Sequence, residues 1–121
     1  PDGESGTLQL DRGEILVRLD GDENLLQELL KVALVEVQHS LPAMCKALTE
    51  RDLGTLQHAA HSLRGAMAIF GAAEAVNAAA QLEELTQNGD QRGLDMAVAR
   101  LDQEMARLEV AMTALLQVDA K

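Results

Sequence analysis

Three histidines, His39, His58 and His61, are the side chains of this sequence that titrate near neutral pH without special help. His58 and His61 are three residues apart, a spacing that could serve two metal ligands on one helix. Neither thiolates nor a further histidine lie close enough in the sequence to complete a ligand set, so no metal site is predicted. The chemistry that remains is that of an exposed imidazole nitrogen acting as a nucleophile.

His61 differs from the other two histidines in its position relative to an apolar stripe. At about 100° of rotation per residue, its side chain lies about 130° from the centre of that stripe and therefore faces solvent. The stripe consists of Leu53, Leu56, Ala60, Leu63, Met67 and Phe70. An imidazole in this position is open to a second molecule.

Two residues one turn beyond His61 strengthen this interpretation. Arg64 places a permanent cation beside the ring, where it would suit an anion held on the imidazole. Gly65 costs roughly 1 kcal/mol of helix stability relative to alanine, which suggests that another molecule must come close, although tight contact between two helices would also explain it. Gln57 and Ala68 lie on the same exposed side. This group of side chains could receive a phosphoryl group.

The elements that must position these residues are helical. Leucine and alanine dominate the composition, and aromatic residues make up only 1% of the chain. Apolar residues recur at helical spacing in residues 11–19, 26–48, 53–70, 72–87 and 94–115. Four amphipathic helices joined by short loops pack most economically as an antiparallel bundle. The predicted fold is therefore all-α, an antiparallel four-helix bundle with a short additional N-terminal helix across one end.

Three finer expectations concern the packing of these helices. Pro42 removes a backbone donor from the long second helix and predicts a kink near Ser40 or a break into two segments. The single cysteine, Cys45, is expected to be a small side chain that is at least half buried. The methionines are expected on or beside the core stripes, at Met44, Met67, Met96, Met105 and Met112.

Charge and composition exclude several classes of protein. The formal charge of −10 repels phosphate backbones, and a single phenylalanine cannot stack against bases, so nucleic-acid binding is not expected. No apolar stretch approaches the roughly 20 residues that span a bilayer, and no export leader is present, which favours a cytoplasmic domain. The same charge favours a monomer. We expect residues 1–9 to be a linker left from a longer chain, residues 10–118 the domain, and residues 119–121 a tail.

One motif resembles a known family. The run AHSLRG at residues 60–65, followed six residues later by Gly-Ala at 71–72, resembles the signature of histidine-containing phosphotransfer (HPt) domains, whose core is Ala-His-x-Leu-Lys-Gly. Residues 21–22 and 82–83 are also similar to the family at the expected distances. The resemblance covers roughly residues 10–117 and implies a place in a bacterial two-component phosphorelay.

The resemblance implies a role for each residue of the site. His61 would be the phosphoacceptor, which takes a phosphoryl group from the aspartyl phosphate of a response-regulator receiver domain and passes it to another receiver. Arg64 replaces the family lysine and keeps its charge but offers a planar fork of donors. Gly65 would leave room for the incoming receiver. Glu83 would accept a hydrogen bond from Nδ1 of His61, which fixes the tautomer and leaves Nε2 as the nucleophile.

The docking face and the cofactors follow from the same resemblance. Gln57 and Ala68 would form the face for the receiver, helped by Ile15 or Leu16 of the first helix. Magnesium is expected on the receiver, and no cofactor is expected on this chain. A Gly-rich phosphate loop is missing from the sequence, so the domain is not expected to bind ATP itself. The resemblance also suggests the C-terminal module of a hybrid sensor histidine kinase.

Two alternatives remain open at the level of sequence. The phosphoacceptor domain of a chemotaxis-type kinase has a similar motif but takes its phosphoryl group from ATP through a separate catalytic domain. A helical interaction module without chemistry would use the bundle as an adaptor, with His61 incidental.

Overall fold

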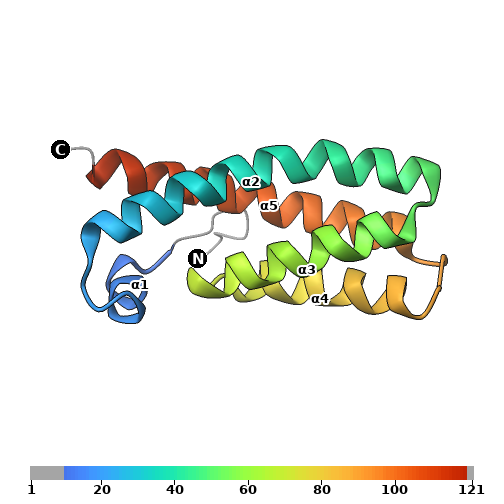
Figure 1. Ribbon diagram of the computed structural model, residues 1–121, viewed down its shortest axis with the longest axis horizontal. Helices are drawn as coiled ribbons and strands as arrows, with labels where there is room; N and C mark the ends of the chain where they lie inside the picture. Colours follow the sequence, from blue (N-terminus) through green and yellow to red (C-terminus); the bar gives the residue numbers. More distant parts are fainter. Residues whose placement is uncertain (1–9, 120–121) are drawn as a thin grey trace, which may run out of the picture.

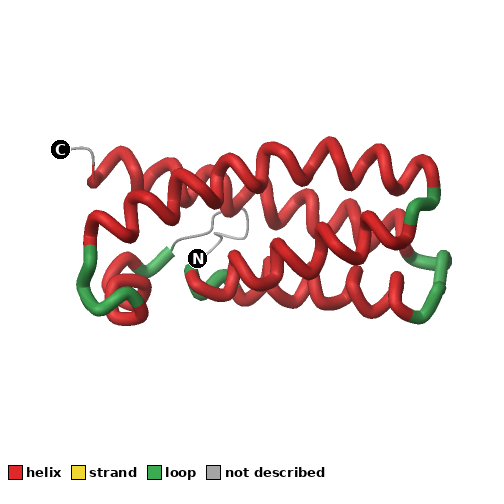
Figure 2. Tube along the Cα trace, in the orientation of Figure 1, coloured by secondary structure: helices red, strands yellow, loops and turns green. Residues whose placement is uncertain are grey.

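The computed structural model describes residues 10–119, which form five helices and no strand (Figures 1 and 2). The helices are α1 (Arg12–Arg18), α2 (Glu23–Glu50), α3 (Leu53–Ile69), α4 (Ala73–Gln87) and α5 (Leu94–Asp119). Helices α2 to α5 run alternately in opposite directions, and α1 lies at one end of the bundle. The predicted all-α fold is confirmed. The expected linker at residues 1–9 and the last two residues of the expected tail lie outside the described residues.

Aspartates start the first three helices. The carboxylates of Asp11, Asp22 and Asp52 each accept a hydrogen bond from the backbone amide three residues further on, which satisfies one of the free donors of a helix N-terminus. At Asp52 the hydroxyl and the amide of Thr55 both donate to the carboxylate, and these bonds lower the pKa of Asp52. The cap of α3, the helix that carries His61, is therefore ionised at neutral pH.

Helix lengths explain why the bundle needs α1. Helices α2 and α5 have 28 and 26 residues, whereas α3 and α4 have 17 and 15. At 1.5 Å per residue the long pair extends about 15 Å beyond the short pair. Helix α1 lies beneath this overhang (Figure 1) and buries Ile15 completely. Arg18 ties α1 to the end of α3, because its guanidinium donates to the carbonyl of Ile69 over 3.2 Å.

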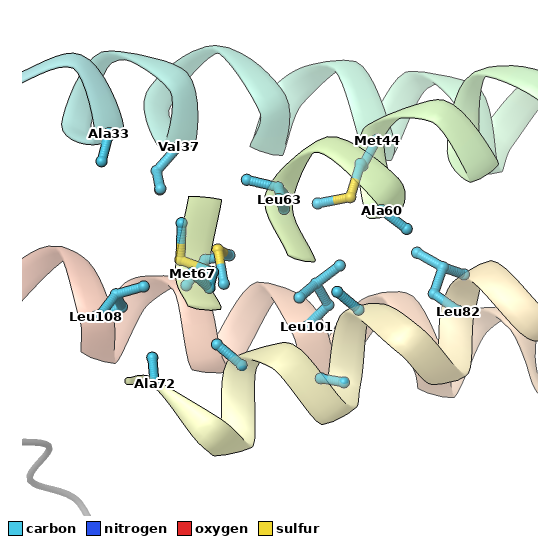
Figure 3. Packing of buried hydrophobic residues seen from close by; sticks show 14 of the residues in the cluster. Ala33, Val37, Met44, Ala60, Leu63, Met67, Ala72, Leu82, Leu101 and Leu108 are labelled. Atoms are coloured by element: carbon cyan, nitrogen blue, oxygen red, sulfur yellow. The ribbon is translucent and has the colours of Figure 1, made fainter. Parts of the chain in front are cut away.

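The core lies between helices α2 to α5, and α3 makes its most extensive contact with α4. Figure 3 shows Leu63 and Met67 of α3 pointing inward among side chains of the other helices. Helix α4 offers mainly small residues to this contact, since Ala75, Ala78 and Ala79 are all buried. Small side chains let two helix axes approach closely. The outward edges of α3 and α4 are therefore brought within side-chain reach of each other.

The turn between α3 and α4 depends on Gly71. Its φ is +69°, in the left-handed region that residues with a Cβ rarely adopt. The amide of Ala72 then donates back to the carbonyl of Met67 over 3.3 Å, a bond that closes the C-terminus of α3. The apolar pattern predicted over residues 53–70 ends here, with Phe70 as the last buried residue before the turn.

Pro42 does not divide the second helix. Helix α2 continues through it from Glu23 to Glu50, so of the two expected outcomes, a kink or a break into two segments, the break does not occur. Pro42 lies on the exposed side of α2, where water can bond the carbonyl that its missing N–H leaves free. Val37 and Met44 on either side of it are both buried in the core, so both halves of α2 pack against the bundle.

Two packing expectations were also wrong. Cys45 is exposed, because it follows the buried Met44 and points about 100° away from the core stripe. Met96 is 78% exposed, since it stands two positions after the buried Leu94 and faces outward on α5. The other four methionines, at positions 44, 67, 105 and 112, are buried as predicted.

Candidate functional site

His61 and Glu83 meet across the contact between α3 and α4. The His61 side chain is 64% exposed at the middle of α3, whereas the Glu83 side chain on α4 is only 10% exposed. The distance between Nδ1 of His61 and Oε2 of Glu83 is 2.8 Å. The hydrogen bond predicted between these two side chains is therefore present in the structure. The burial of Glu83 also shows that it is not a carboxylate surrounded by water.

This contact selects one tautomer of the imidazole. An ionised carboxylate can only accept hydrogen bonds, so Nδ1 of His61 must carry the proton that bonds Glu83. In the neutral ring the other nitrogen, Nε2, then has a lone pair and no proton. Because the ring is exposed, that lone pair is available to a molecule arriving from solvent.

Arg64 contacts the carboxylate as well as the ring. Its Nε lies 3.3 Å from Oε1 of Glu83, and its Nη2 lies 3.4 Å from Nδ1 of His61. Oε1 is buried and accepts no hydrogen bond, so the nearby guanidinium balances its charge by proximity alone. Within the described residues, Arg64 therefore forms its ion pair with Glu83.

Gly65 lies in open space one turn after His61. A Cβ placed on Gly65 would have no neighbouring atom within 4 Å, so close contact between helices does not explain this glycine. Ala68, the next residue on this side of α3, is exposed and small. The surface of α3 on the C-terminal side of His61 therefore carries only small side chains at Gly65 and Ala68, as the sequence predicted.

A hollow of about 460 Å³ opens on the other side of His61, toward the start of α3. Gln57, predicted on this face, lines it from α3 and is half buried. The hollow is lined by Gly54, Gln57, His58, His61, Glu83 and Gln87. Sequence reasoning missed Gln87 as a site residue, because only the register between α3 and α4 shows that the last turn of α4 lies opposite the first turns of α3.

The two docking residues predicted on α1 have different positions. Ile15 has no exposed surface, so its predicted contact with a partner is wrong: its side chain completes the core beneath α2. Leu16 is half buried and packs against the core cluster. Val17, which the sequence did not single out, is the exposed apolar residue of α1 at 77%. In a helix of seven residues, the apolar pattern alone did not distinguish the inward from the outward side.

Residues 28–111 match the model of the Hpt domain family, so the chain belongs to the histidine-containing phosphotransfer domains. These domains act in two-component phosphorelays, in which they exchange phosphoryl groups with receiver domains. Among solved structures, the chain is similar to histidine-containing phosphotransfer protein B (HptB) from Pseudomonas aeruginosa PAO1, with a TM-score of 0.80 and 22% identity. The match covers 90% of this chain and 95% of that protein. Comparison with curated proteins gave no match.

Two further observations concern what residues 10–119 do not contain. None of the helices in this range combines the length and the apolar character needed to cross a membrane. Nor does this range bring together three or more histidine, cysteine, aspartate or glutamate side chains in a way that could hold a metal ion.

We predict that Glu83→Gln relaxes the tautomer of His61. An amide can accept from Nδ1–H or donate to a bare Nδ1, whereas the carboxylate only accepts, and a hydrogen bond to a charged group contributes about 1.5–3 kcal/mol. The ratio of the two neutral tautomers should therefore change by about tenfold or more, in favour of Nε2–H. Ring nitrogen chemical shifts in ¹⁵N-labelled protein measure this ratio, with His39 in the same spectra as the control. Unchanged His61 shifts would show that Glu83 does not set the tautomer.

Proposed function

We propose that His61 is the phosphoacceptor and that Nε2 is its reacting atom. The observation that carries this proposal is the 2.8 Å contact between Nδ1 and the buried Glu83, which leaves the Nε2 lone pair on an exposed ring. The family membership of residues 28–111 supports it, because such domains carry phosphoryl groups on histidine. The AHSLRG motif places that histidine at position 61.

The transfer step needs no proton movement on this chain. The Nε2 lone pair forms a bond to phosphorus while the bond between phosphorus and the aspartyl oxygen of the receiver breaks, and its electron pair stays on the aspartate carboxylate. The proton on Nδ1 remains in place throughout, held by Glu83. The reverse sequence returns the phosphoryl group to a receiver aspartate. Catalysis on this side is therefore a matter of orientation.

Arg64 supports this step through Glu83. A phosphoryl group brings negative charge next to a buried carboxylate, and two like charges at such short range repel each other strongly. The 3.3 Å contact between Arg64 and Glu83 neutralises that carboxylate before the phosphoryl group arrives. In this proposal Arg64 is a positioning residue that holds Glu83 against Nδ1 of His61.

The partner is a response-regulator receiver domain, which docks over the low surface of α3 next to His61. Gly65 and Ala68 leave this surface flat, and Leu16 and Val17 offer apolar contacts from α1, which Arg18 ties to the end of α3. Magnesium would be bound by the receiver, at the aspartate that donates or accepts the group. One receiver donates and another accepts, and the position of the domain within a hybrid sensor kinase remains a prediction from the resemblance.

We predict that His61→Gln abolishes labelling by a ³²P-phosphorylated receiver domain, while its helical content by circular dichroism stays unchanged. Glutamine keeps a polar side chain of similar reach but has no nucleophilic nitrogen. His39→Gln, on a different helix, is the matched control and should label at the wild-type level. Full labelling of the His61 variant would overturn the assignment. Labelling of the wild type only by a chemotaxis kinase core with ATP would instead favour the chemotaxis-type alternative.

The two glycines that flank the end of α3 should respond in opposite ways to alanine. Gly65→Ala should raise the free energy of unfolding by about 0.5–1 kcal/mol, because the site is helical and open. Gly71→Ala should lower it by about 1–2 kcal/mol, because its φ is +69° and a Cβ would lie 3.4 Å from the Arg18 guanidinium.

Urea unfolding followed by circular dichroism measures both effects on stability. Despite its greater stability, Gly65→Ala should slow transfer from a phosphorylated receiver several-fold, because the new methyl group stands on the docking surface. Equal transfer rates in Gly65→Ala and wild type would show that the receiver does not approach over this residue.

A further inference from the structure

The hollow beside His61 lies where the exposed side of its ring points. Side chains on a helix lean toward its N-terminus, so the His61 ring extends over the preceding turn and not over Gly65. The lining confirms this direction, because His61 shares the hollow with Gln57 and His58 from the turn before it. On α4, which runs antiparallel, the residue opposite that turn is Gln87.

Two side-chain amides in this hollow are uncommitted. Within residues 10–119, the side-chain amides of Gln57 and Gln87 make no hydrogen bond with another residue. Arg64 does not line this hollow; it lines a smaller one with Ala80 and Glu84, and Glu83 and Gln87 border both hollows. The lining of this hollow beside the ring therefore includes the two amides and does not include the guanidinium.

The charges around the hollow beside His61 also favour the binding of an anion there. Glu83 is the only carboxylate that lines the hollow in the part of the chain that the structure describes, and Arg64 balances it from behind at 3.3 Å. The hollow therefore presents amide donors and an imidazole wall, with no unbalanced negative charge. Its volume of about 460 Å³ holds a phosphoryl group and leaves space for the donor group of a partner.

Resting on the proposed function, we propose that this hollow seats the phosphoryl group while it is bound to Nε2 of His61, and that the amides of Gln57 and Gln87 donate hydrogen bonds to its oxygens. His58 forms the side wall. The two glutamines thereby help to set the lifetime of the phosphohistidine, next to Arg64, which contacts Glu83 and the ring.

The test uses phosphoramidate, a small donor that needs no receiver domain. Nε2 attacks its phosphorus, the P–N bond breaks, and ammonia leaves. Gln57→Glu replaces one donor by an isosteric carboxylate that faces the phosphoryl group. Gln103→Glu adds the same charge on the exposed side of α5 and is the matched control. The half-life of the phosphohistidine after removal of the donor, and the side-chain amide signals in ¹H–¹⁵N spectra, are measured.

We expect the half-life to fall about threefold to tenfold in Gln57→Glu and to remain unchanged in Gln103→Glu, since hydrogen bonds to charged groups are among the strong ones. The amide signals of Gln57 and Gln87 should shift on phosphorylation, and that of Gln103 should not. A wild-type half-life in Gln57→Glu, or unshifted amide signals in the phosphorylated protein, would show that the hollow does not bind the phosphoryl group. Either result would leave the assignment of His61 as the phosphoacceptor unaffected. Wild-type protein that takes up no label at His61 would instead overturn the proposed function.

Discussion

The site depends on one hydrogen bond between a half-exposed imidazole and a buried carboxylate. Nδ1 of His61 can bond Glu83 only if it is protonated, and this condition leaves Nε2 free on the outer side of the ring. A carboxylate with so little exposure would be costly without a counter-charge, and Arg64 supplies that charge from the next turn of α3. His61, Glu83 and Arg64 therefore form one unit, joined by the hydrogen bond and the ion pair that both involve Glu83.

The bundle makes this unit possible through close packing. Buried alanines on α4 let it approach α3, and the antiparallel register places Glu83 opposite His61 and the end of α4 opposite Gln57. Helix α1 contributes at a distance: it completes the core under the overhang of α2 and holds the end of α3 through Arg18. The remainder of the domain thus positions the His61 ring against Glu83.

Much of this arrangement could be predicted from the sequence, because helical periodicity determines which residues of a helix point outward. The exposure of His61, the open surface at Gly65 and the ends of α3 all follow from local rules. Contacts between residues on different helices were harder to predict from the sequence. Arg64 lies beside the ring as expected, but its contact with Glu83 was not foreseen and Gln87 was missed, because both depend on the register between α3 and α4. Ile15 was misplaced because a helix of seven residues carries too few apolar positions to define its buried side.

The central claim is that Glu83 holds the proton on Nδ1 and so reserves Nε2 for phosphorus. It is tested most directly by phosphorylating ¹⁵N-histidine-labelled protein and measuring, by ¹⁵N and ³¹P NMR, which ring nitrogen of His61 is coupled to phosphorus. The account predicts a phosphorus coupling at Nε2 and a protonated Nδ1 in the same ring. Phosphorus bound to Nδ1, or to a histidine other than His61, would contradict it.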